Sequence, residues 1–183
     1  MKSHSFVSLS GLNKAGVSLK WLSVGVVIGL ISFFLLTSSV RRSETPFIST
    51  QLAAASLMRE ATREISSYRL SLGIEIDPLL DPNGTGLIGP EFTELTTTLG
   101  NLEAKRTSTN PDFAALIVKY FRELGLKKGD PVAIGASGSF PSLVLATLCA
   151  CEAMNLEPLL IYSIGASEHG ATHPEFTFVR MLQ

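Results

Sequence analysis

A run of twenty uncharged residues near the amino terminus constrains this chain more than any other feature. Residues 21–40 contain no Asp, Glu, Lys, Arg or His and are flanked by Lys20 on one side and by Arg41 and Arg42 on the other. At about 1.5 Å of rise per residue, a helix of this length covers the ~30 Å hydrocarbon core of a bilayer. A helix also satisfies its own backbone hydrogen bonds, as lipid requires. The run therefore predicts a single transmembrane helix that anchors the chain in a cell membrane.

The run leaves open whether it is cleaved as a signal and whether it pairs with a second copy. It is long for a cleaved secretory signal, and residues 37–41, Thr-Ser-Ser-Val-Arg, make a poor cleavage site, so an uncleaved signal-anchor is favoured. Trp21 is placed to anchor one membrane interface. Gly25 and Gly29 form a G-x-x-x-G motif, through which two copies of the helix can approach closely. Glycine is also common in membrane helices without this role.

Charge is divided along the chain. Residues 1–42 hold five Lys or Arg and no acid, whereas the other 141 residues hold ten Lys or Arg against sixteen Asp or Glu, a net charge of −6. The basic tail favours its own retention inside the cell, which places the soluble part outside the cytoplasm, although Arg41 and Arg42 oppose this orientation. A net negative domain gains no general attraction to DNA or RNA, which argues against a nucleic-acid partner.

We expect four segments: a basic tail over residues 1–20, the membrane helix over 21–40, a linker over 41–48 and a soluble α/β domain over 49–183. The first part of the domain, residues 49–126, is predicted to be helical. Apolar residues recur every three or four positions over 49–72 and again over 110–124, where Asn110 and Pro111 are suited to begin a helix.

No cofactor or metal is predicted for the domain. Residues 81–88 resemble the start of a calcium-binding loop, but Phe92 stands where that loop needs a bidentate Glu, so an ordinary turn is expected. Cys149 and Cys151 are two residues apart in a predicted helix and match no zinc-ligand spacing, which favours small buried residues.

The second part of the domain, residues 131–183, has the pattern of a βαβ unit. Apolar runs over 131–135 and 158–164 flank a predicted helix over 142–155, and such a crossover makes the two strands parallel. Two parallel strands do not form a stable sheet, and both faces of a parallel sheet need cover. Another element also begins near residue 176, so we expect a partial parallel-sheet domain from a longer protein.

Both predicted strands end in the same four residues, Ile-Gly-Ala-Ser, over 134–137 and 164–167. In open α/β sheets, ligands gather at the carboxyl ends of strands, so Ser137 and Ser167 are expected on one rim. Gly138 and Ser139 begin the following helix, where free N–H groups and the helix dipole favour a phosphate or carboxylate.

A basic pair, Lys105-Arg106, lies in a threonine-rich segment of the helical part and is the other candidate for binding an anion. A solvated helix explains the same residues.

The turn after the first predicted strand, residues 135–139, also resembles the G-x-S-x-G nucleophile elbow, with Ser137 as the nucleophile and His169 or His173 as the base. Ser139 replaces the last glycine of that motif, and Ser137 needs a histidine within hydrogen-bond reach to be activated. Simple packing of a tight turn is the third interpretation. A metal on the histidines is not expected, because Gly170 interrupts the helical frame that i, i+4 ligands need.

Four stretches together resemble the poly-gamma-glutamate system protein family: residues 85–89, 109–111, 134–141 and 164–168. The resemblance implies a part in making or exporting a γ-linked glutamate polymer at the bacterial membrane, with the membrane subunits of poly-gamma-glutamate synthetase as partners and a chain that continues beyond residue 183. It implies no mechanism and transfers no catalytic residue.

The polymer is a polyanion and the domain is acidic, so contact would use Lys105 and Arg106 or the helix start near Ser139. The competing classes are a serine-dependent hydrolase or transferase acting at the membrane surface and a purely structural subunit.

Overall fold

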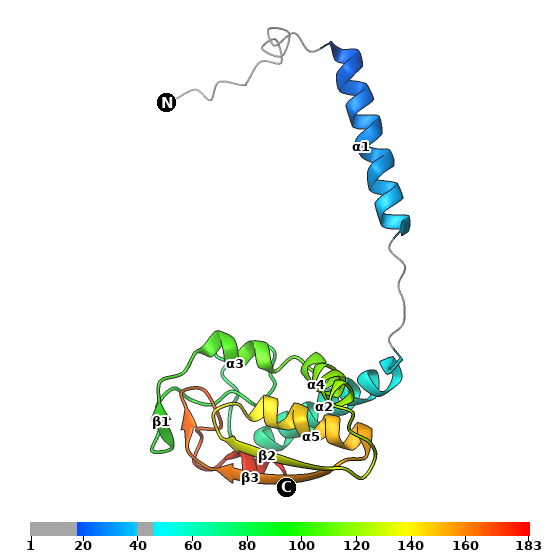
Figure 1. Ribbon diagram of the computed structural model, residues 1–183. Coiled ribbons are helices and arrows are strands. Elements are labelled where there is room, and N and C mark those ends of the chain that lie inside the picture. The colour runs from blue at the N-terminus through cyan, green and yellow to red at the C-terminus, as the bar shows by residue number, and fades with distance from the viewer. Residues whose placement is uncertain (1–17, 40–45) are drawn as a thin grey trace, which may run out of the picture. The chain divides into compact units, whose positions relative to one another are not determined.

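The computed structural model describes residues 18–39 and 46–183 and divides the chain into two compact units, Met1–Glu44 and Thr45–Gln183 (Figure 1). Residues 1–17 of the predicted tail, the last residue of the predicted membrane run and most of the predicted linker lie outside the described residues.

Helix α1 (Leu19–Ser39) is the described part of the first unit. Its segment Lys20–Ser39 is long and apolar enough to cross a membrane, and none of it is buried within the described chain. A side chain added at Gly25 or Gly29 would meet no atom within 4 Å. The glycine motif is therefore open to a neighbouring helix, and self-association through it stays a prediction.

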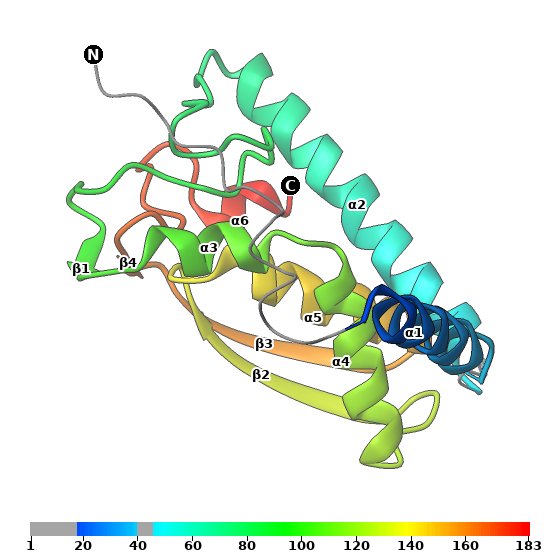
Figure 2. The ribbon, with the colours of Figure 1, turned by 90° about the horizontal axis from the view of Figure 1, so that it is seen from above.

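The second unit combines helices with small parallel sheets, as predicted for an α/β domain. Helices α2 (Ile48–Ser71), α4 (Asp112–Glu123) and α5 (Pro141–Met154) pack against one another. Strands β2 (Pro131–Ser137) and β3 (Glu157–Ser163) pair in parallel along their whole length, and α5 connects them. Figure 2 shows the two strands side by side, and Figure 1 shows the helices of this unit above them.

Small side chains let α5 pack closely in the middle of the core. Ala146, Ala150 and Cys151 are fully buried, and Cys149 is a free, buried thiol like Cys151. The helix begins with Pro141 in its first turn and ends at Asn155, which adopts a left-handed conformation (φ 53°). Burial raises the pKa of the Cys149 thiol to about 11. Both cysteines are thus small buried residues, as expected.

The β2–β3 sheet is covered on one face only. Val132 and Ile134 of β2 and Leu160 of β3 face the core, whereas Leu159 and Ile161 point outward and are 64% and 71% exposed. Parallel sheets normally have both faces covered.

A second, smaller sheet joins two distant parts of the chain. Strand β1 (Thr96–Thr98), within the segment predicted to be helical, pairs in parallel with β4 (Ala166–Ser167). Helix α3 (Leu102–Ser108) follows β1, and a short helix, α6 (Phe178–Met181), lies near residue 183. The threonine-rich segment therefore supplies a strand as well as a helix, and it brings Lys105 to the carboxyl end of β2.

Candidate functional site

The two Ile-Gly-Ala-Ser segments do not occupy equivalent positions. Ser137 ends β2 opposite Ser163, the last residue of β3, whereas Ser167 lies in β4 beside β1. The chain still returns Ser167 to the rim, because its N–H donates to Ser139 Oγ (3.0 Å). Ser137 Oγ donates to the same oxygen (3.0 Å). Three predicted ligand residues are therefore joined by hydrogen bonds.

Lys105 of α3 completes this group, which we call the strand-end cluster: Lys105, Ser137, Gly138, Ser139 and Ser167. The ammonium Nζ donates to the Ser139 carbonyl and to Ser167 Oγ (2.6 Å) and lies 4.0 Å from the centroid of the Phe140 ring. The side chain is only 1% exposed, and no carboxylate pairs with it among residues 18–39 and 46–183. Burial lowers the pKa of Lys105 to about 8, because an unpaired charge is disfavoured away from water.

The backbone amides of the turn after β2 are already used within the protein. Gly138 N–H donates to the carbonyls of Ser163 (3.0 Å) and Gly165 (3.1 Å), and Ser139 N–H donates to Ser137 Oγ (3.3 Å). An anion bound here would have to replace these hydrogen bonds. The geometry thus favours a role for this turn in holding loops together over the predicted anion rim.

The two candidate histidines make no hydrogen bond to Ser137 in the described part of the chain. His169 is buried in a left-handed conformation (φ 59°), and its Nδ1 has no hydrogen-bond partner there. His173 Nδ1 accepts from the N–H of Glu175 (3.2 Å). Ser137 instead donates to Ser139, so a serine–histidine pair is not assembled in this conformation.

No cluster of three or more His, Cys, Asp or Glu suited to a metal occurs in the described ranges. In the segment that resembles a calcium loop, Asp81 is buried and its Oδ2 accepts from Thr85 Oγ1 (2.9 Å) and Gly86 N–H (2.7 Å). The chain's own donors thus satisfy this carboxylate, as in an ordinary turn.

Arg106 points away from the strand-end cluster, because neighbouring helix residues are rotated by about 100° from each other. Its guanidinium donates to the carbonyls of Leu79 and Leu80 and pairs with Glu103. It lines a cavity of about 810 Å³ together with Arg59 and Arg63 of α2. We call this the arginine cavity.

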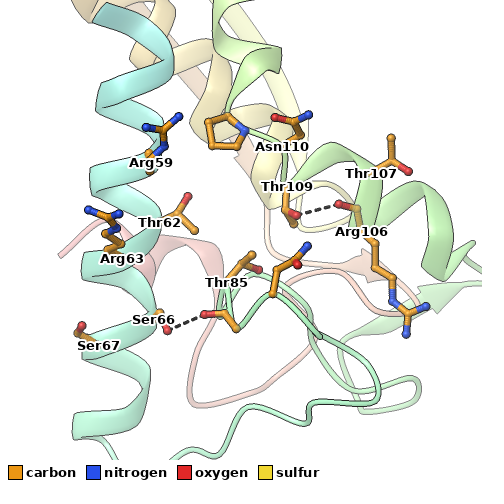
Figure 3. Close-up of a pocket in the computed structure, with 13 residues that line it drawn as sticks. Arg59, Thr62, Arg63, Ser66, Ser67, Thr85, Arg106, Thr107, Thr109 and Asn110 are labelled. Carbon is orange, nitrogen blue, oxygen red and sulfur yellow. Dashed lines mark hydrogen bonds between the residues drawn. The ribbon is translucent and has the colours of Figure 1, made fainter. Parts of the chain in front are cut away.

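Hydroxyl and amide groups make up most of the remaining lining of the arginine cavity, and no Asp or Glu contributes to it. Figure 3 shows the α2 residues along one wall and Thr109 and Asn110 along the other. The full remaining lining is Thr62, Ser66, Ser67, Asn83, Gly84, Thr85, Thr107, Thr109, Asn110 and Pro111. Arg59 and Arg63 are exposed. The cavity therefore presents cations and hydrogen-bond donors to solvent, which is the chemistry that binds carboxylates or phosphates.

The sequence carried only a weak signal for this cavity. Arg59 and Arg63 are four residues apart on the polar side of α2, but Glu60 and Glu64 follow them directly, so the segment reads as an ordinary solvated helix face. Nothing in the sequence indicates that this face meets Arg106, which lies more than forty positions later.

Comparison with known proteins adds no relative. No protein-family model matches the chain, and no curated protein or solved structure is similar enough to count as a match.

Proposed function

We propose that this protein is a membrane-anchored accessory component of a bacterial poly-gamma-glutamate synthesis or export system, whose soluble unit binds carboxylates of the anionic polymer. The observation that supports binding is the arginine cavity. Three arginine residues and no Asp or Glu line it, in a region of the chain whose net charge is −6. Such a local reversal of charge is what an acidic domain needs to hold a polyanion.

The chemistry of the cavity suits a γ-linked glutamate chain. Each repeat carries a free α-carboxylate, and arginine binds a carboxylate through two parallel hydrogen bonds. Threonine and serine hydroxyls such as Thr62 and Thr85 can bond to the amide groups between carboxylates. The volume of about 810 Å³ falls in the range of roughly 300–1,000 Å³ common for small-ligand sites. A short stretch of polymer is therefore the ligand we expect.

A binding measurement with the full chain in nanodiscs tests this proposal. A fluorescent γ-glutamyl oligomer should bind, and Arg59→Ala should weaken binding by about tenfold, the order of one charge-assisted hydrogen-bonded pair. Arg180→Ala is the matched control, because it removes the same charge from the exposed surface of α6 and does not line the cavity. Equal losses in both variants would reduce the effect to general charge and contradict the proposal.

The second candidate function is a serine-dependent hydrolase or transferase, and one contact favours it. Lys105 Nζ lies 2.6 Å from Ser167 Oγ, and a lysine with a pKa of about 8 is neutral often enough to accept a proton from serine. This arrangement replaces Ser137 and the histidines with Ser167 and Lys105. Ser167 is buried and lines none of the cavities described here, so we favour polymer binding.

A fluorophosphonate probe separates the two functions. Labelling that is lost in Ser167→Ala and kept in Ser137→Ala would support the hydrolase or transferase, whereas an unlabelled folded chain supports binding alone.

A further inference from the structure

Helices α2 and α4 run antiparallel where α2 begins. Phe47, just before α2, lies under the Arg122 guanidinium, 4.9 Å from carbon to ring centroid. One turn later, Gln51 Nε2 donates to the carbonyl of Ala115 (3.1 Å). As α2 advances, its contacts on α4 therefore move back toward the start of α4.

This arrangement sets which side chains share a face. In an antiparallel pair, the residue after each contact position points to the same side of both helices, since each residue turns about 100° from the last. On α4, Ala114 before the Ala115 contact is buried in the core, whereas Leu116 after it is exposed. Tyr120 lies one turn beyond Leu116 on the same face and is exposed as well.

Apart from Glu123, which follows the Arg122 contact, the residues exposed on this side of the two helices are apolar. We call them the apolar face: Ile48 and Leu52 of α2, Leu116 and Tyr120 of α4, and Leu124 just after α4. All five are exposed, Leu52 by 62% and Leu124 by 75%.

Basic residues surround the apolar face. Lys119, Lys127 and Lys128 are exposed beside it and Arg122 is half-buried. The acids nearby are Asp112, one turn before Leu116, Asp130 and Glu123, which pairs with Lys119 (3.7 Å), so four cations stand against three acids. The local balance is positive in an otherwise acidic domain. Leucine, isoleucine and tyrosine bordered by lysine and arginine are typical of surfaces that lie in the membrane interface.

Chain connectivity identifies the bilayer as the partner. Only residues 40–47 separate the end of α1 from the start of α2, and eight extended residues reach at most about 28 Å. With α1 across a membrane, the first turns of α2 cannot lie farther than this from the lipid surface. Leu159 and Ile161 on β3 are exposed and apolar as well, but more than a hundred residues separate them from α1, so the short linker does not limit their distance from the lipid.

We propose that the apolar face docks on the surface of the bilayer that holds α1, with Lys119, Lys127 and Lys128 contacting anionic headgroups. The inference depends on α1 as a membrane span and not on the polymer or on the arginine cavity.

Site-specific quenching in nanodiscs tests the docking. A fluorophore is attached at Leu124→Cys or, as the matched control, at Leu159→Cys on the opposite exposed patch, while the native cysteines are buried. Lipids with a nitroxide headgroup should quench the label at position 124 several-fold more than the label at 159. Phosphatidylglycerol should increase the difference, and Lys127→Gln with Lys128→Gln should reduce it without disturbing packing.

Three results would overturn the proposal. Equal quenching at both positions would mean that the domain has no preferred face toward lipid, and no quenching at either would mean that it stands away from the bilayer. Disulfide-linked dimers through position 124 in folded chains would assign the face to a second copy instead. No polymer is present in this experiment, so its failure leaves the proposed binding function testable on its own.

Discussion

Lys105 and Arg106 are neighbours on α3, yet their two sites use positive charge in different ways. Lys105 is buried in the strand-end cluster and holds Ser139 and Ser167 together. Arg106 lines the arginine cavity, where Arg59 and Arg63 are exposed to solvent. A buried cation that is bonded to its own chain mainly shapes the fold, whereas the exposed guanidiniums of Arg59 and Arg63 are free to meet a ligand. Arg106 is half-buried and bonded to Leu79, Leu80 and Glu103, so it borders the cavity without the same freedom. The strand-end cluster should therefore govern stability and the arginine cavity should govern binding.

The largest expected effect comes from adding a side chain at Gly170, next to the strand-end cluster. A Cβ at Gly170 would overlap the carbonyl oxygen of Gly138, so Gly170→Ala has to push two backbone segments apart. We expect it to lower the free energy of unfolding by about 3 kcal/mol, as overpacking does. Gly135→Ala is the control, because a Cβ there meets no atom within 4 Å. Denaturant titrations that show similar losses for both variants would contradict this close packing.

The next effect should appear in binding and leave stability nearly unchanged. Arg59→Ala with Arg63→Ala removes both exposed guanidiniums, so the dissociation constant of a γ-glutamyl oligomer should rise about 100-fold, at about tenfold per arginine. The unfolding free energy should change by less than about 0.5 kcal/mol, because both side chains are on the surface. Fluorescence anisotropy and urea titration measure the two quantities. A double variant that binds normally would remove the cavity from the proposed function.

Lys105→Ala should show the opposite pattern. It leaves the Ser139 carbonyl and the Ser167 hydroxyl without their buried donor, while it also removes an unpaired buried charge. We expect a net loss of about 2 kcal/mol in unfolding free energy, with oligomer binding by the folded protein unchanged. A loss of binding in a variant that stays folded would show that the strand-end cluster touches the ligand.

Local patterns predicted most of the secondary structure of the second unit. The expected helices over 49–72 and 142–155 match α2 and α5 within one residue at each end, and the apolar runs match β2 and β3 closely. Periodicity and capping residues act over a few positions, so the sequence contains this information.

The pairing of distant segments could not be read in the same way. β1 is three threonines with no alternating pattern, so the sequence did not predict its pairing with β4. The position of Ser167 depends on that pairing and could not be predicted either. The different directions of Lys105 and Arg106 could have been foreseen, since adjacent residues of a helix do not share a face. The arginine cavity depends on α2 meeting the α3–α4 junction, which only the tertiary structure provides.

The smallest effect is a pH dependence that belongs to Lys105. Its pKa is about 8 in the fold, compared with 10.5 for an ordinary lysine, so between these values the unfolded chain binds a proton that the folded chain does not. The unfolding free energy should therefore rise with pH across this window. From about pH 8 to about pH 9.5 we expect a rise of about 1.5 kcal/mol relative to Lys105→Met, which cannot titrate.

The comparison with Lys105→Met cancels the contributions of the other titrating groups to the pH dependence of the unfolding free energy. Burial raises the pKa of Cys149 to about 11 and that of Tyr162 to about 12, so both lower stability as the pH passes the values they have when unfolded, and both are present in the variant. Chemical denaturation at several pH values measures the difference between the two chains. Arg106→Met should show no such difference from the unmodified protein, because a guanidinium stays charged throughout this range. If the difference in unfolding free energy between Lys105→Met and the unmodified protein did not change with pH, the Lys105 ammonium would have to be in contact with water. Lys105 would then not be a buried cation, and the contrast with the exposed arginines would be wrong.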